Sequence, residues 1–122
     1  MPEMSQLPEN LLPLTPAVFN ILLALADGEK HGYAIMLEVE HNTQGEVKMG
    51  PGTLYGSIKR MLAAGFIEES DERPDPELDD ERRRYYRLSG LGQRVLVAEA
   101  ERLARQVRVA QLKHVLNFFP GV

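Results

Sequence analysis

Two short strands separated by an acidic loop interrupt a chain that is otherwise helical in pattern. The first predicted strand runs from Phe66 to Ser70, and the second from Arg83 to Leu88, where side chains alternate with a period of two. The loop between them, Asp71 to Glu81, contains two prolines and a run of acids. Helical segments lie before and after this hairpin. That order predicts a mainly α fold with a small β-hairpin, the winged helix-turn-helix.

The chain begins with a proline-containing segment, residues 1–14, which is predicted to be an extended arm. Thr15 and Pro16 then supply an N-cap and a proline at the first helical position, which predicts a helix from Pro16 to Ala26. This helix is apolar almost all round, so it either lies centrally in the fold or packs on another subunit. A second helix is expected from His31 to His41.

The third predicted helix, from Pro51 to Ala64, has two contrasting faces and is capped by Gly65. Apolar residues at positions i, i+4, i+7 and i+8 point inward; they are Leu54, Ile58, Met61 and Leu62. The outward residues are small, polar or basic and include no carboxylate: Gly52, Thr53, Gly56, Lys59, Arg60 and Ala63. Tyr55 and Ser57 fall at the boundary between the two faces.

The last predicted helix starts after the cap residue Ser89 and runs from Gly90 to Asn117, which is about 40 Å at 1.5 Å per residue. Its apolar residues alternate at spacings of four and three, which is typical of packing against another helix, most simply the same helix of a second copy. Residues 15–88 are therefore predicted to form the DNA-binding domain and residues 89–122 a dimerisation helix. The predicted interface comprises Phe19, Leu23, Leu96, Ala100, Leu103, Val107 and Ala110.

The charges of the chain are strongly segregated although the net charge is only −4. Residues 48–67 carry three cations and no acid, and residues 82–98 carry five cations and no acid. Between them, residues 68–81 carry nine acids and one arginine. A surface field depends on where charges sit rather than on their total, so two basic segments remain suited to a polyanion.

Two interpretations of these basic segments stay open on pattern alone. The third helix either reads base edges, with Gly52, Thr53 and Gly56 allowing close approach, or presents a merely solvated face. The arginines of the second strand either contact the DNA backbone or pair with the neighbouring acids; they are Arg82, Arg83, Arg84 and Arg87. The acidic loop is expected to swing away from phosphates.

Several other classes of protein are disfavoured. No apolar run approaches the roughly 20 residues of a membrane helix, the amino-terminal residues lack a signal-peptide pattern, and there is no cysteine. His31, His41 and His114 have no metal-ligand spacing, so no metal or cofactor is expected. No phosphate-binding loop or nucleophile motif occurs, which disfavours an enzyme. A cytoplasmic location is the simplest expectation.

At the third helix the sequence becomes recognisable. Residues 15–35, 50–69 and 83–96 resemble the PadR family of bacterial transcriptional regulators. The matching motifs are HGY at 31–33, GTLY at 52–55, AGFIE at 64–68 and YYRLS-x-x-G at 85–92. A single carboxy-terminal helix is similar to the short subgroup of that family.

The resemblance implies a homodimeric winged-helix repressor that binds a palindromic operator. It also implies a small apolar or aromatic effector, because some relatives bind planar aromatic molecules between the first and last helices. Some of those relatives stack the effector on a tryptophan, which this chain lacks. Pattern and resemblance together give the candidate DNA-binding residues Tyr33, Lys48, Thr53, Tyr55, Gly56, Lys59, Arg60, Arg83 and Arg84.

Two alternatives belong to other classes. A winged-helix module that binds protein and not DNA is favoured slightly by the net negative charge, but it gives no reason for a carboxylate-free stretch over residues 48–67. A ligand-binding or enzymatic dimer would need titratable groups that converge on the interface cavity. Only His114 and Asn20 are candidates there, which is little for catalysis.

Overall fold

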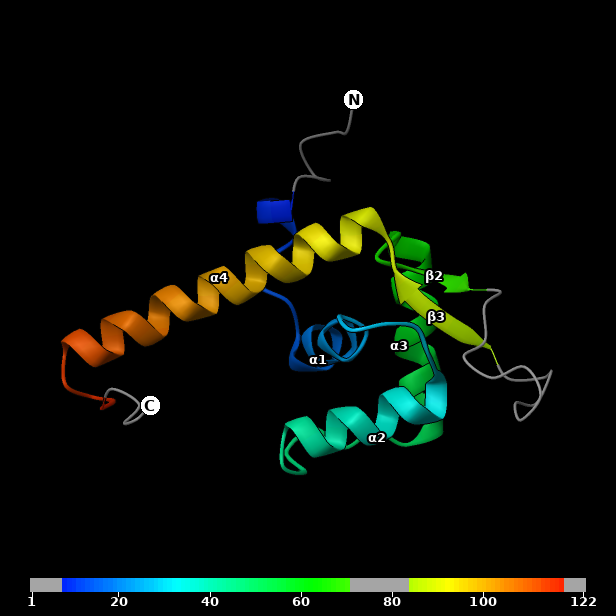
Figure 1. Ribbon diagram of the computed structural model, residues 1–122, viewed down its shortest axis with the longest axis horizontal. Helices are drawn as coiled ribbons and strands as arrows, with labels where there is room; N and C mark the ends of the chain where they lie inside the picture. The colour runs from blue at the N-terminus through cyan, green and yellow to red at the C-terminus, as the bar shows by residue number, and fades with distance from the viewer. Residues whose placement is uncertain (1–7, 71–83, 118–122) are drawn as a thin grey trace.

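The computed structural model describes residues 8–70 and 84–117. Four α-helices pack together with a small sheet at one side, next to α3, and the longest helix crosses the top of the others and extends well beyond them (Figure 1). This is the predicted mainly α winged helix-turn-helix with a long carboxy-terminal helix. The elements are η2 (Pro8–Leu11), α1 (Pro16–Ala24), β1 (Lys30–His31), α2 (Gly32–Asn42), α3 (Pro51–Ala64), β2 (Ile67–Ser70), β3 (Tyr85–Leu88) and α4 (Gly90–Leu112).

The local signals for α3 and α4 act as predicted. Pro51 opens α3 behind the N-cap Gly50, and Gly65 closes it with a φ of 81°, a left-handed conformation that suits glycine. Ser89 caps α4 by accepting a hydrogen bond from the Gly92 amide at 2.9 Å. The other ends differ by a few residues, because α1 stops at Ala24 and α4 at Leu112.

One hydrophobic core holds the three amino-terminal helices, the sheet and the start of α4 together. It is made from fully or almost fully buried side chains of every one of these elements except β1. The predicted inward residues of α3 are part of it, with Leu62 at its margin. Its members include Ile21, Leu22, Ile35, Val39, Leu54, Ile58, Met61, Ile67, Tyr86 and Val95.

The sheet has three antiparallel strands in the order β1–β3–β2, one more strand than the predicted hairpin. His31 of β1 pairs with Tyr85 of β3. The ring of His31 meets the ring of Tyr85 edge-on, with 5.4 Å between the centroids. Tyr85 and Tyr86 are both buried although they point to opposite faces, because Tyr86 belongs to the core and Tyr85 packs against His31 on the other face. Simple alternation predicted the two faces but not that both are covered.

The start of α4 is fixed to the start of the wing by one carbonyl group. The Phe66 oxygen accepts a hydrogen bond from the Ser89 amide at 3.0 Å. A Cβ at Gly92 would lie 1.9 Å from the same oxygen, so only glycine fits there. Ser89 also donates from its hydroxyl to the Gly65 carbonyl at 2.5 Å. These contacts set the direction in which α4 leaves the winged helix.

The described part of the predicted extended arm is not extended. Pro8–Leu11 forms a 3-10 turn that packs against α4, and the Leu14 amide donates to Glu99 at 2.8 Å. Leu11, Leu12 and Leu14 contact the core, so burial of these leucines provides the reason for the turn. Among the described residues, no helix is long and apolar enough to cross a membrane.

Candidate nucleic-acid interface

Helix α3 separates its side chains into a buried face and an exposed face. Thr53, Lys59 and Arg60 are exposed, as predicted, and Gly56 is partly exposed. Of the two boundary residues, Tyr55 is 48% exposed whereas Ser57 is buried. Ser57 accepts a hydrogen bond from the Arg60 guanidinium at 3.2 Å, which draws Arg60 along the helix. The exposed face therefore presents small groups with two cations at its centre.

Tyr55 also fixes how closely α2 approaches α3. Its phenol end lies against Gly32, where a Cβ would come within 2.4 Å of the Tyr55 hydroxyl oxygen. Gly32 is itself buried at the start of α2. The sequence indicated Gly32 only as part of the HGY motif, and the contact between Gly32 and Tyr55 was not predicted. A glycine directly after an N-cap histidine was the available signal.

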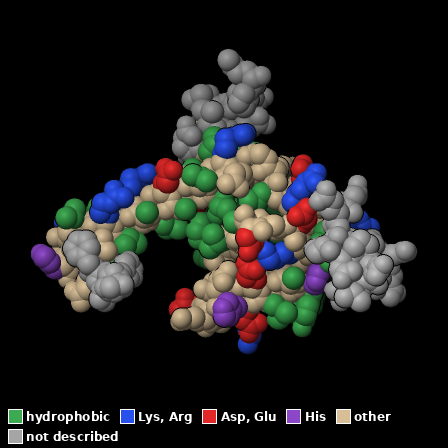
Figure 2. Space-filling model, in the orientation of Figure 1, with side chains coloured by type: hydrophobic (Ala, Val, Ile, Leu, Met, Phe, Trp, Pro, Cys, Tyr) green, Lys and Arg blue, Asp and Glu red, His purple; other side chains and the backbone are tan. Residues whose placement is uncertain are grey.

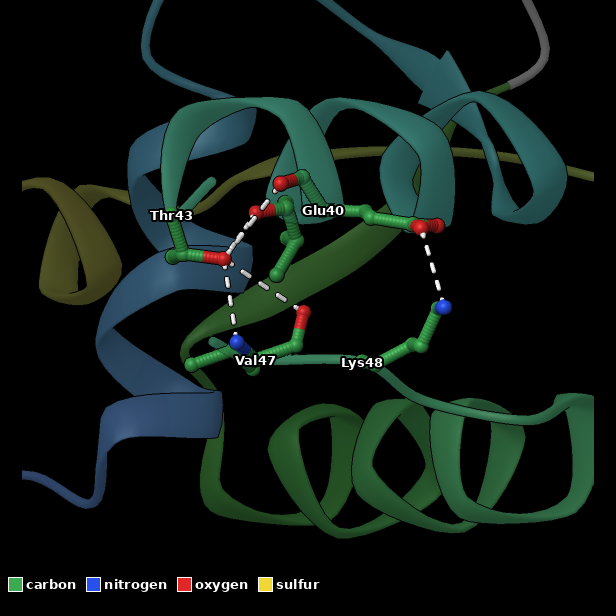
Figure 3. Close-up of polar contacts among 5 residues, drawn as sticks. Glu40, Thr43, Val47 and Lys48 are labelled. Atoms are coloured by element: carbon green, nitrogen blue, oxygen red, sulfur yellow. Dashed lines mark hydrogen bonds and ion pairs between the residues drawn. The ribbon is translucent and has the colours of Figure 1, made fainter. Parts of the chain in front are cut away.

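The turn between α2 and α3 is organised by Thr43 (Figure 3). Its hydroxyl donates to the Val39 carbonyl at 2.8 Å and accepts from the Val47 amide at 3.0 Å. Gln44 and Gly45 follow with positive φ values of 54° and 82°, which reverse the chain direction. The side chain thus links the end of α2 to the segment that leads into α3.

The candidate residues outside α3 have different environments. Lys48 lies just before α3 and pairs with Glu40 of α2 at 3.5 Å, as Figure 3 shows. Tyr33 on α2 is 57% exposed. The start of this helix is capped by His31, whose ring accepts a hydrogen bond from the Ala34 amide. Arg83 lies outside the described residues, as does the acidic loop at 71–81. Among the described residues Lys59 forms no ion pair.

The described arginines of the wing are paired. Arg84 contacts Glu69 and Arg87 contacts Glu68, each at 3.0 Å between nitrogen and oxygen. Figure 2 shows acidic and basic side chains next to one another over this part of the molecule. The sequence suggested pairing with acids of the neighbouring loop, but these two partners belong to the opposite strand, β2. Strand register brings them together.

Tyr86 lies directly beneath this surface. It is almost fully buried, and burial raises the pKa of its hydroxyl above the usual range, with the negative charge of Glu69 adding to the effect. Tyr55 of α3 acts in the same direction, whereas Arg84 opposes them. Strand register places Glu69 directly opposite Tyr86, so the Glu69–Arg84 pair lies beside this buried tyrosine.

The predicted interface residues lie along one side of α1 and α4. Leu96 is 5% exposed and belongs to the core of the chain itself, so it has little surface left for a partner. Phe19, Leu103 and Ala110 are partly exposed, whereas Leu23, Ala100 and Val107 are exposed. Beyond Glu99 no described residue of α4 is buried. None of the residues in 8–70 and 84–117 therefore buries the outer half of α4.

A cleft of about 310 Å³ lies between α1 and α4. Its apolar walls are Leu14, Pro16, Phe19 and Leu103, and its polar groups are Asn20, Glu99 and Arg102. Glu99 is 1% exposed and was missed by the sequence reasoning. Arg102 bonds to it at 2.5 Å, and this bond together with the Leu14 amide holds the pKa of Glu99 below its ordinary value. The described residues contain no cluster of three potential metal ligands.

The comparisons with known proteins agree with this architecture. Residues 21–98 match the profile of the transcriptional regulator PadR-like family. The chain belongs to the PadR-like family. The members of this family are described as transcriptional regulators, and the chain shares the winged-helix fold of a PadR family transcription regulator. A curated relative is an uncharacterized 37.1 kDa protein in transposon TN4556 of Streptomyces fradiae, 36% identical over 85 residues. Those residues are 70% of this chain but only 22% of the length of the relative.

Solved PadR-family structures share the fold. A PadR family transcription regulator from Clostridium difficile superposes with a TM-score of 0.64 at 21% identity, covering 84% of this chain and all (100%) of that one. The Bacillus subtilis PadR in complex with operator DNA gives a TM-score of 0.56 at 22% identity, covering 70% of this chain and 47% of that one. The similarity extends over the winged helix and at least part of α4.

Proposed function

We propose that this PadR-family regulator is a homodimeric repressor that binds a palindromic operator through α3 and the wing. The observation that carries the proposal is the exposed face of α3, where Thr53, Lys59 and Arg60 lie without a carboxylate. Gly52 and Gly56 allow the helix backbone to approach base edges in a major groove. Operator binding also requires the compartment of the genome, in agreement with the cytoplasmic location expected from the sequence.

Dimerisation would set the distance between two reading helices. The uncovered outer half of α4 supports it, because Leu103, Val107 and Ala110 continue the spacing of the core-facing residues past the end of the core. A two-fold pair would place the α3 helices about 34 Å apart, one turn of duplex DNA. Phe19 and Leu23 on α1 would extend the same apolar surface.

Relief of repression by a small aromatic effector is the finer part of the proposal. The cleft between α1 and α4 supports it, since an apolar floor with a guanidinium and an amide at one side suits a planar ring with one polar substituent. We expect the dye anilinonaphthalene sulfonate to bind there. Phe19→Ala should weaken that binding severalfold in a fluorescence titration, and Val97→Ala, outside the cleft, should leave it unchanged. Equal affinities of the two variants would refute the site.

The decisive test of operator binding is selection of bound fragments from random duplex DNA by the purified protein. A palindrome with half-sites one turn apart is expected. Titration of the selected duplex at several salt concentrations should give a log–log slope near −7 if Lys59, Arg60, Arg83 and Arg84 of both subunits contact phosphates, and near −5 if one pair of arginines is neutralised. A slope near zero would remove the electrostatic basis of the proposal.

Lys59→Ala separates two roles of the central cation of α3. A uniform loss of affinity on all duplexes would mean a phosphate contact. A loss of about 1–3 kcal/mol confined to one base pair would mean that Lys59 reads a guanine. No loss on any duplex would favour the alternative, a winged-helix module for protein binding. The net charge of −4 is the observation behind that alternative.

A further inference from the structure

Two glutamates that follow one another on β2 form ion pairs with Arg87 of β3 and with Arg84, the residue that precedes β3. Glu68 contacts Arg87 and Glu69 contacts Arg84, each pair at 3.0 Å. The four side chains are 46–70% exposed, so water and salt compete with both pairs. The two pairs have the same nitrogen-to-oxygen distance, but Arg84 is more exposed than Arg87, at 70% against 47%.

Register places the two pairs on opposite faces of the sheet. Glu69 is opposite Tyr86, and Ile67 is opposite Leu88, so Glu69 shares a face with side chains of the core. That core face is covered by α3. Glu68 is opposite Arg87 and shares the other face with Ser70 and Tyr85. Only the Glu69–Arg84 pair therefore lies on the side of the reading helix.

The neighbours of the Glu69–Arg84 pair connect it to α3. Tyr86 lies next to Glu69 across the strands, and its buried hydroxyl is within electrostatic reach of Glu69, Arg84 and Tyr55. Tyr55 is on the exposed edge of α3, in the GTLY stretch that precedes Lys59 by one turn. A phosphate that reaches the Arg84 guanidinium from this side of the sheet would compete with Glu69 for it.

We propose that Glu69 is an affinity-limiting residue that occupies the Arg84 guanidinium and so lowers the attraction of the wing for DNA phosphates. The inference rests on the proposed operator binding and adds to it a residue that restrains it. An exposed ion pair is weak enough to be broken by a phosphate, yet the exchange costs part of the binding energy. Glu68 has no such role, because its arginine lies on the other face.

The test compares Glu69→Gln with Glu68→Gln, which change the same charge one residue apart. Binding of each full-length variant to a fluorescent duplex of generic sequence, and to the selected operator, is followed by anisotropy at several salt concentrations. Glu69→Gln is expected to tighten binding to both duplexes by about threefold to tenfold, and to steepen the log–log salt slope by about one per subunit. Glu68→Gln is expected to stay within about twofold of wild type.

The same substitution in Arg84→Gln protein tests whether the gain in DNA affinity depends on Arg84. In Arg84→Gln protein, Glu69→Gln should change affinity by less than about twofold, because no freed guanidinium remains. Equal gains from Glu69→Gln and Glu68→Gln would overturn the inference in favour of a general charge effect. Weaker binding by Glu69→Gln would overturn it by making Glu69 a residue that positions Arg84. Thermal melting by circular dichroism checks that all variants fold. If the wild-type protein binds neither duplex, the proposed operator binding is refuted, independently of the role of Glu69.

Discussion

Of the glycines that the structure describes, Gly92 has the least room for a side chain. A Cβ there would meet the Phe66 carbonyl oxygen at 1.9 Å, and backbone lies on both sides of that contact. Gly92→Ala should therefore lower the free energy of unfolding by about 2–4 kcal/mol in urea denaturation. Gly90→Ala is the control, since only the Arg94 side chain would lie near, at 3.5 Å, and its effect should stay within about 0.5 kcal/mol. Equal stability of the two variants would contradict the contact.

Glu99 should make the stability of the protein depend on pH. Its pKa is lowered in the folded protein by Arg102 and the Leu14 amide, so its contribution to stability is present above the unfolded pKa near 4.5 and is lost as pH falls through the lower folded value. Glu99→Gln should cost about 1–3 kcal/mol at pH 7. The difference from wild type should shrink below pH 4.5 in urea unfolding measured over a pH series. A difference that is constant with pH would show that the charge has no role.

At the scale of elements, the orientation of α3 depends on the turn that Thr43 organises. Thr43→Val keeps the shape of the side chain but removes the bonds to the Val39 carbonyl and the Val47 amide. It should lower the free energy of unfolding by about 1–2 kcal/mol and weaken operator binding, which urea denaturation and anisotropy would measure. Asn42→Ala, an exposed neighbour, should change neither quantity appreciably. Unaltered DNA affinity in Thr43→Val would mean that the turn does not orient α3.

The elements that the sequence predicted are those set by local chemistry. Pro51 and Gly65 mark the ends of α3, and Ser89 marks the start of α4, because caps act within one turn of the chain. The missed features depend on distant partners. The short strand β1 exists only because it pairs with Tyr85 and Tyr86, far along the chain. The candidate site followed the same division: exposure on α3 was predictable from spacing, whereas the pairing of Arg84 required the strand register.

In the molecule taken together, the outer half of α4 is not buried by any part of the chain that the structure describes. Val107→Glu places a charge within the proposed seam, where Val107 is 39% exposed in one chain and can accept it without unfolding. We expect sedimentation to change from dimer to monomer and operator affinity to fall at least about tenfold, because half of the contacts are lost. Val97→Glu, at 44% exposure outside the seam, should remain dimeric. A dimeric Val107→Glu would place the interface elsewhere.

The single carbonyl shared by Phe66, Ser89 and Gly92 also limits how a signal could travel. Since it joins the residue before β2 to the first turn of α4, we expect these two pieces to move together. A ligand that tilts α4 would then move the wing by the same angle. The chain would then bend between α1 and α2 or in the outer turns of α4. Structures in different ligand states should therefore keep the distance from Phe66 to Gly92 constant, while the distance between the two reading helices changes.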